Sequence, residues 1–235
     1  MSPAARTWGL AVATEKGPVD SYERLHAAIT KGRPLNPALF PRLVVTAAAG
    51  TAAQVCSLRG PLLTFTSGRN GTIGALAYAR HLVESEAIDG MAVVGADMDA
   101  GYLHDDPTKP DAARFPEAGY HGAAAAVLTG DTDADGARLG QVVTRSGFGR
   151  VGWRPTLDPV PYQQIAEAMH LETEPTLYQH GWRHAPEMAD VRELPSAYGA
   201  MAPLIPIVAS YAARAGDGSD APDVVCVSAD ELGSI

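Results

Sequence analysis

The stretch at residues 60–79, GPLLTFTSGRNGTIGALAYA, constrains the fold of this chain more than any other. Its apolar run PLLTFTS has the length of a β-strand and stops at a glycine-rich turn. Residues 72–86 then carry apolar side chains at helical spacing, and the apolar run at 88–97 follows as a buried strand. A tight turn between a strand and a helix usually presents a side chain for chemistry, and here Arg69 stands at its apex.

The same alternation runs along the rest of the chain. We expect a strand from Leu10, a helix capped by Ser21, a small-residue helix at 44–58, strands at 121–131 and 137–149, helices at 160–172 and 196–216, and a last strand at 223–230. Helices that interleave with strands define the α/β class. With 235 residues and no internal repeat of fixed period, the chain is predicted to form a single domain over 1–235.

Charge and composition exclude several functions. The formal net charge is −9 and no run of Lys or Arg occurs, which argues against nucleic acid and anionic membranes as partners. We find no apolar run as long as the roughly 20 residues of a membrane span and no signal peptide. We therefore expect a cytoplasmic protein whose two cysteines, Cys56 and Cys226, are buried and reduced.

No pattern indicates a cofactor or a metal. The dinucleotide fingerprint GxGxxG and a Cys/His cluster are both absent from the sequence. His180 and His184 stand four residues apart, with Glu187 as the best third ligand, but Gly181 weakens a helix between them. Asp97 and Asp99 follow a strand end, where we expect them to cap the next loop rather than bind a cation.

Four stretches together resemble the β-ketoacyl synthases of polyketide and fatty-acid biosynthesis, which have the thiolase fold. They are LNPALFPRLVVTAAAGTAAQVCSLRGPLLTFTSG, ALAYARHLVESEAIDGMAVVGAD, YHGAAAAVLTG with GARLGQVVTRSGFG, and SAYGAMAPLIPIVASYAARAG with PDVVCVSADELGS. The resemblance implies a thiolase-like fold, truncated relative to full-length members, with mixed sheets layered with helices.

The departures from that family bear on activity. Active members carry a nucleophilic cysteine where this chain has Arg69, and a guanidinium stays protonated and has no lone pair to offer. The two family histidines are also in doubt, because His180-Gly181 lacks the threonines of the HGTxT loop and SAYGAMAP contains no histidine. The resemblance therefore implies an inactive subunit without a cofactor.

An inactive ketosynthase-like chain resembles a chain length factor, which walls off part of the acyl tunnel of an active partner. The implied partner is a full-length ketosynthase, in a heterodimer or heterotetramer, with acyl carrier protein involved indirectly and polyene or aryl-polyene chains as products. Family members dimerise through the strand before the nucleophile. This places the interface and tunnel at Leu63, Thr64, Phe65, Thr66, Ser67, Gly68, Arg69, Asn70, Thr72, Ile73 and Leu76.

Other interpretations remain open from the sequence. Arg69 either orders the partner's site through charge-assisted hydrogen bonds or pairs with a nearby carboxylate. A stand-alone acyltransferase or cyclase would need Cys56, His180 or His184 as its nucleophile or base. A homodimeric scaffold with no tunnel role is the third alternative.

Overall fold

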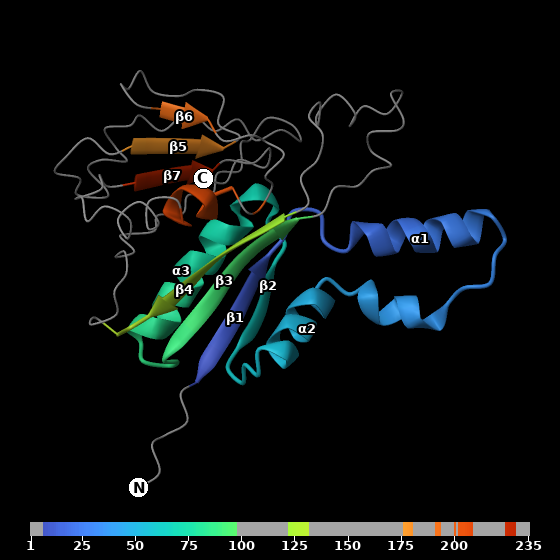
Figure 1. Ribbon diagram of the computed structural model, residues 1–235, viewed down its shortest axis with the longest axis horizontal. Helices are drawn as coiled ribbons and strands as arrows, with labels where there is room; N and C mark the ends of the chain where they lie inside the picture. Colours follow the sequence, from blue (N-terminus) through green and yellow to red (C-terminus); the bar gives the residue numbers. More distant parts are fainter. Residues whose placement is uncertain are drawn as a thin grey trace, which may run out of the picture.

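Two β-sheets, with helices packed against the first, organise the part of the chain that the structure describes (Figure 1). The structure is a computed structural model, and the residues described are 7–97, 122–131, 176–180, 191–193, 200, 202–208 and 224–228. The predicted α/β class, with mixed sheets layered with helices, is confirmed.

The first sheet has four strands in the order β2-β1-β3-β4. Their bounds are Trp8–Ala13 for β1, Leu62–Phe65 for β2, Gly90–Asp97 for β3 and Gly122–Thr129 for β4. β1 pairs in parallel with both β2 and β3, whereas β4 runs antiparallel to β3. Among the described residues, β2 is therefore the last strand at one side of this sheet, and β4 is the last strand at the other.

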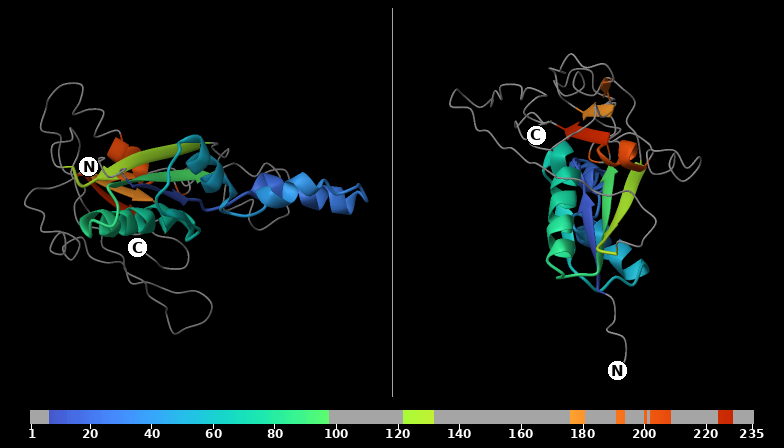
Figure 2. Two further views of the ribbon diagram at one scale, coloured as in Figure 1. Left: turned by 90° about the horizontal axis from the view of Figure 1, so that it is seen from below. Right: turned by 90° about the vertical axis from the view of Figure 1, so that its left-hand side faces the viewer.

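Helices cover both faces of the first sheet. Side chains alternate between the faces of a strand, so Leu10 and Val12 face one way while Ala11 and Val93 face the other. Helix α2 (Ala47–Val55) packs over the first face, and helix α3 (Gly71–Glu84) packs over the second. The two helices lie on opposite sides of the strands in Figure 2. Because helices cover both faces of the central strands, β1 and most of β3 consist of apolar residues.

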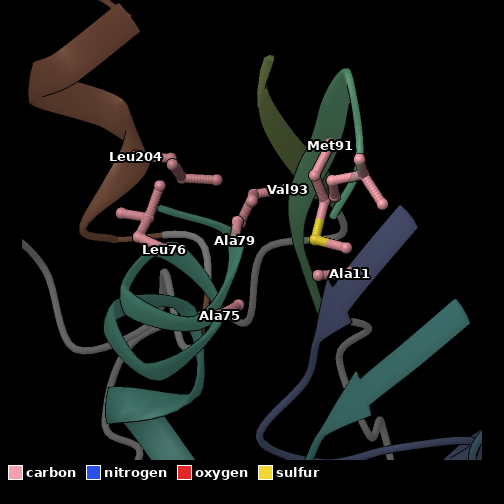
Figure 3. Close-up of a cluster of buried hydrophobic side chains, with 8 residues drawn as sticks. Ala11, Ala75, Leu76, Ala79, Met91, Val93 and Leu204 are labelled. Atoms are coloured by element: carbon pink, nitrogen blue, oxygen red, sulfur yellow. The ribbon is translucent and has the colours of Figure 1, made fainter. Parts of the chain in front are cut away.

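The larger core lies between α3 and the sheet (Figure 3). Ala75 and Ala79 of α3 are fully buried, and their small side chains let the helix approach Met91 of β3 closely. Leu204, far away in the sequence, lies beside Leu76 in the same cluster. The core is completed by Ala11, Ile88 and Val93.

The second sheet was not predicted in full. Its strands are β5 (Thr176–His180), β6 (Val191–Glu193) and β7 (Val224–Ser228), all parallel, in the order β6-β5-β7. Only β7 was expected from the sequence. His180 is the last residue of β5, and His184 lies outside the described residues.

The two sheets share one topology. In each, the first strand in the chain is central and pairs in parallel with the second and the third. Residues 204–208 form a short helix between β6 and β7, as α3 does between β2 and β3. The structure thus contains two related halves without a repeated sequence pattern.

The predicted helix near residue 20 exists, but its expected cap does not. Helix α1 spans Val19–Thr30 and follows Pro18, whose carbonyl already accepts the backbone N–H of Ser21 at 3.0 Å. Ser21 therefore lies inside the first turn, and the helix has no side-chain cap. The proline-rich stretch after it forms a short 3-10 helix, η1 (Pro37–Arg42), with the Asn36 side chain as its cap.

The prediction of a buried Cys56 is wrong. Cys56 directly follows α2 and is exposed, because only Ala49 of that helix is buried against the sheet. Several other predictions lie outside the described residues, namely Cys226 as a thiol, the loop at 98–121 including Asp99, the strand at 137–149, the helix at 160–172 and the His184–Glu187 pair.

The start of α3 generates a testable prediction. A Cβ at Gly71 would lie 3.3 Å from the Ala13 Cβ and 3.4 Å from the Phe65 carbonyl oxygen. We expect Gly71→Ala to lower the free energy of unfolding by about 1–3 kcal/mol, the usual cost of overpacking. Gly74→Ala is the matched control, since its Cβ would meet the Phe65 ring at an ordinary 3.6 Å.

In the interior of a helix, alanine is favoured over glycine by about 0.5–1 kcal/mol. Gly74→Ala should therefore be neutral or stabilising. Urea unfolding of the two variants checks both expectations, and an equal loss of stability in both would contradict the close approach of α3 to the strands.

Candidate functional site

The turn that follows β2 has a defined backbone. Gly68 has φ = +60°, a conformation that favours glycine, and it opens the single 3-10 turn η2 (Gly68–Asn70) that leads into α3. Thr66 and Ser67 are exposed just before it. Residue 69 lies in this turn, as predicted, while the side chain of Arg69 is outside the described part of the structure.

The first residues of α3 face the second half of the chain. Thr72 is fully buried, and its hydroxyl donates a hydrogen bond to the carbonyl of Ala200. Asn70, just before the helix, is also buried. Leu204 packs in the core cluster with Leu76 of α3, so the segment that contains Ala200 and Leu204 contacts the first turns of this helix.

A buried carboxylate, that of Asp97, joins the carboxyl ends of the strands. It is 5% exposed and lies at the end of β3. One oxygen accepts hydrogen bonds from the Thr14 hydroxyl at 2.9 Å, the Glu15 N–H at 2.9 Å and the Lys16 N–H at 3.1 Å. The other accepts the Ala200 N–H at 2.6 Å. The prediction that Asp97 caps the loop following β3 lies outside the described residues, and the hydrogen bonds that are described join Asp97 to the loop after β1 and to Ala200.

Strand β2 has one open edge in the part of the chain that is described. The Pro61 carbonyl accepts the Leu10 N–H at 2.9 Å, and the Phe65 carbonyl accepts the Thr14 N–H at 3.0 Å. In a parallel sheet, the backbone N–H and C=O groups of every second residue of a strand point toward the same neighbouring strand. The backbone groups of Leu62 and Thr64 therefore point away from β1, toward the open edge.

Apolar and aromatic side chains surround this open edge. Leu62 is 43% exposed and Tyr78 of α3 is 45% exposed. The Tyr78 ring lies 6.4 Å from that of Phe65 and 6.5 Å from that of His81, between centroids. We define the β2 edge surface as Leu62, Thr64, Phe65, Thr66, Ser67 and Tyr78.

The predicted interface residues divide by burial. Thr66 and Ser67 are exposed, Leu63, Thr64, Phe65 and Gly68 are half-buried, and Asn70, Thr72, Ile73 and Leu76 are buried. The sequence analysis missed Leu62 and Tyr78. The alternation along β2 could have indicated Leu62, whereas Tyr78 is placed by the contact of its ring with Phe65.

The described site contains few side chains that could act as a nucleophile. Residues 66–73 carry hydroxyls, an amide and a guanidinium but no thiol. Cys56 precedes β2, so it lies at the amino end of a strand about 13 Å long and away from the turn at the carboxyl end. Among the described residues, no three His, Cys, Asp or Glu side chains lie close enough together to hold a metal ion.

The comparisons with known proteins agree on the fold. No protein-family model matches the sequence, and no curated protein is significantly similar to it. Among solved structures, the ishigamide ketosynthase/chain length factor matches with a TM-score of 0.70 at 18% identity, over 98% of this chain and 72% of that one.

Two further structures extend this agreement. The tetronic acid condensing enzyme AbyA1 matches with a TM-score of 0.62 at 15% identity, over 97% of this chain and 74% of that one. A type II polyketide synthase acyl carrier protein in complex with its ketosynthase, bound to the hexaketide, matches with a TM-score of 0.52 at 13% identity, over 100% of this chain and 63% of that one. The chain thus spans 63–74% of the length of these three structures.

The architecture therefore defines a thiolase-like ketosynthase fold, as the resemblance implied. Within the described ranges, no helix has the length and apolarity needed to cross a membrane.

The Asp97 carboxylate generates a second prediction. In Asp97→Asn, an amide N–H₂ would replace one of the two accepting oxygens and face a backbone or hydroxyl donor that then has no acceptor. We expect the free energy of unfolding to fall by about 1–3 kcal/mol, the cost of a buried unsatisfied donor.

Asp89→Asn is the matched control, because Asp89 precedes the same strand, is exposed, and its carboxylate accepts only the Thr7 N–H among the hydrogen bonds described. Urea unfolding should show a change within about 0.5 kcal/mol for that variant. Equal effects at the two positions would contradict the special role of Asp97.

Proposed function

We propose that this chain is a non-catalytic, chain-length-factor-like partner of an active ketosynthase. The observation that carries the proposal is the residue type at position 69, since the turn between β2 and α3 of a ketosynthase fold here contains an arginine. Acyl transfer to an enzyme needs a nucleophile with a free lone pair, and arginine stays protonated in proteins.

The alternative nucleophile that the structure describes does not rescue catalysis at this turn. Cys56 lies at the other end of β2. This supports the proposal that the subunit shapes the active site of its partner and does not itself react with the substrate. The similarity to the ishigamide ketosynthase/chain length factor supports the same assignment.

The open edge of β2 is the proposed contact with the ketosynthase. A partner strand that pairs along Leu62 and Thr64 would satisfy backbone groups that an edge strand otherwise presents to water. It would also cover the exposed side chains of Leu62 and Tyr78. A stable complex of this kind typically buries about 1,200–2,000 Å² or more in total.

The acyl tunnel is the proposed role of the inner members of the predicted set. Leu63 and Phe65 are half-buried between the open edge and the core beneath α3. The buried Ile73 and Leu76 support them from the helix. In this arrangement bulkier side chains at the edge shorten the space for a growing polyketide chain of the polyene type.

The remaining partner assignments follow from the same proposal. Acyl carrier protein delivers chains to the ketosynthase rather than to this subunit, which suits a chain with a net charge of −9. No cofactor of its own is needed, since the chemistry takes place in the cytoplasm on the partner subunit.

Co-expression tests the proposed function. This chain, carrying the only tag, is produced with the full-length ketosynthase of its own pathway, and the native mass of the purified particle is measured. A stable particle containing both chains supports the proposal. A homogeneous particle of this chain alone, with an active ketosynthase in the flow-through, contradicts it and favours the stand-alone enzyme or the homodimeric scaffold.

A backbone substitution tests the interface itself. Thr64→Pro removes the outward-pointing N–H of β2 without touching the bonds to β1, and edge strands tolerate proline at such positions. We expect the affinity for the ketosynthase to fall at least about tenfold, equivalent to about 1.4 kcal/mol.

Thr64→Val is the matched control. It keeps the N–H and removes only a buried hydroxyl for which the structure shows no hydrogen-bond partner among the described residues. It should bind as the wild type does. Circular dichroism of both isolated variants confirms that the fold persists, and unchanged binding by folded Thr64→Pro would exclude β2 as the pairing strand.

A further inference from the structure

A helical arm leaves the first sheet and returns to it with no residue of its helices fully buried. We define the arm as residues 19–45, which contain α1 and η1. None of the residues of either helix is buried. The arm projects away from both sheets (Figures 1 and 2). It starts after the carboxyl end of β1 and ends where α2 begins.

The arm has an apolar side that meets water. Tyr22 and Ile29, predicted to share one face of α1, are 48% and 59% exposed, and Phe40 of η1 is 52% exposed. Within the arm, the Tyr22 hydroxyl donates a hydrogen bond to the Leu43 carbonyl at 2.8 Å. Isolated helices shorter than about 12–15 residues are only marginally stable in water. Since α1 has 12 residues, we expect it to be stabilised by packing against another surface.

The position of the arm indicates what covers it. η1 contacts α2, and α2 packs against β2. The arm therefore lies beyond α2 on the side of the sheet where β2 is the last strand (Figure 1). The arm and the β2 edge surface therefore lie toward the same side of the sheet (Figure 1).

The charge of the arm also differs from that of the chain. It carries four basic residues (Arg24, Lys31, Arg33 and Arg42) and two acidic ones (Asp20 and Glu23), a formal charge of +2. The rest of the chain then has −11, since the total is −9. A surface that fits the arm is accordingly apolar with an acidic rim.

We propose that the arm clasps the same ketosynthase subunit that pairs along β2, holding it through Ile29 and Phe40. This inference rests on the proposed function, because it assigns the arm to the partner already placed at the open edge. Pairing along four-residue β2 alone offers a short contact. The arm lengthens the contact along β2, and its own exposed apolar side chains become buried in that contact.

The test measures the affinity of arm variants for the purified ketosynthase, immobilised on a biosensor surface. Ile29→Gln and Phe40→Gln should each weaken binding about tenfold, as expected for apolar anchors of an interface. Val127→Gln is the matched control, because Val127 is 62% exposed on β4, at the opposite side of the same sheet. It should bind within about twofold of the wild type.

Hydrogen exchange provides a second readout. The backbone amides of α1 should exchange more slowly in the wild-type complex than in the isolated chain, because the clasp stabilises the helix. Since Ile29 and Phe40 are exposed, their variants should keep the circular dichroism of the wild type.

The outcomes separate the two proposals. A complex that forms with unchanged affinity for both arm variants and unchanged exchange in α1 overturns the clasp and leaves the proposed function in place. Absence of any complex between the wild-type chain and the ketosynthase overturns both. Self-association of this chain that Ile29→Gln abolishes also overturns the clasp, since the arm would then bind a second copy.

Discussion

The Asp97 carboxylate is the constraint on which the candidate site depends. It gathers hydrogen-bond donors from the segment after β1 and from Ala200, which belong to different halves of the chain. Charge-assisted hydrogen bonds of this kind are shorter and stronger than neutral ones. Because Thr14 also donates its N–H to Phe65, the end of β2 is held by the same set of bonds.

This arrangement explains how the turn can persist without a catalytic residue. Its shape follows from the positive φ of Gly68, the close approach of Gly71 to Ala13 and the bond from Thr72 to Ala200. None of these contacts requires a particular side chain at position 69. The proposed function uses the turn and the strand before it as an interface, a role for which no nucleophile is needed at position 69.

The two proposals place association with a partner on one side of the first sheet. The β2 edge surface provides backbone pairing and aromatic side chains, and the arm provides exposed apolar side chains beyond α2. Edge strands and uncovered apolar faces are both features that proteins usually cover. A single partner that lies along β2 and beneath the arm covers both.

The sequence by itself determined the order of strands and helices in the first half, because period and run length are local properties: β2, α3 and β3 lie where their apolar patterns predict them. It also indicated the special turn at residue 69. Only the tertiary structure decided what is buried. The thiol of Cys56 was predicted to be buried from its apolar neighbours in sequence, yet burial depends on what packs against it in space, and it is exposed. The pairing of β5 with β6 and the edge position of β2 likewise depend on contacts between distant segments, which no local pattern records.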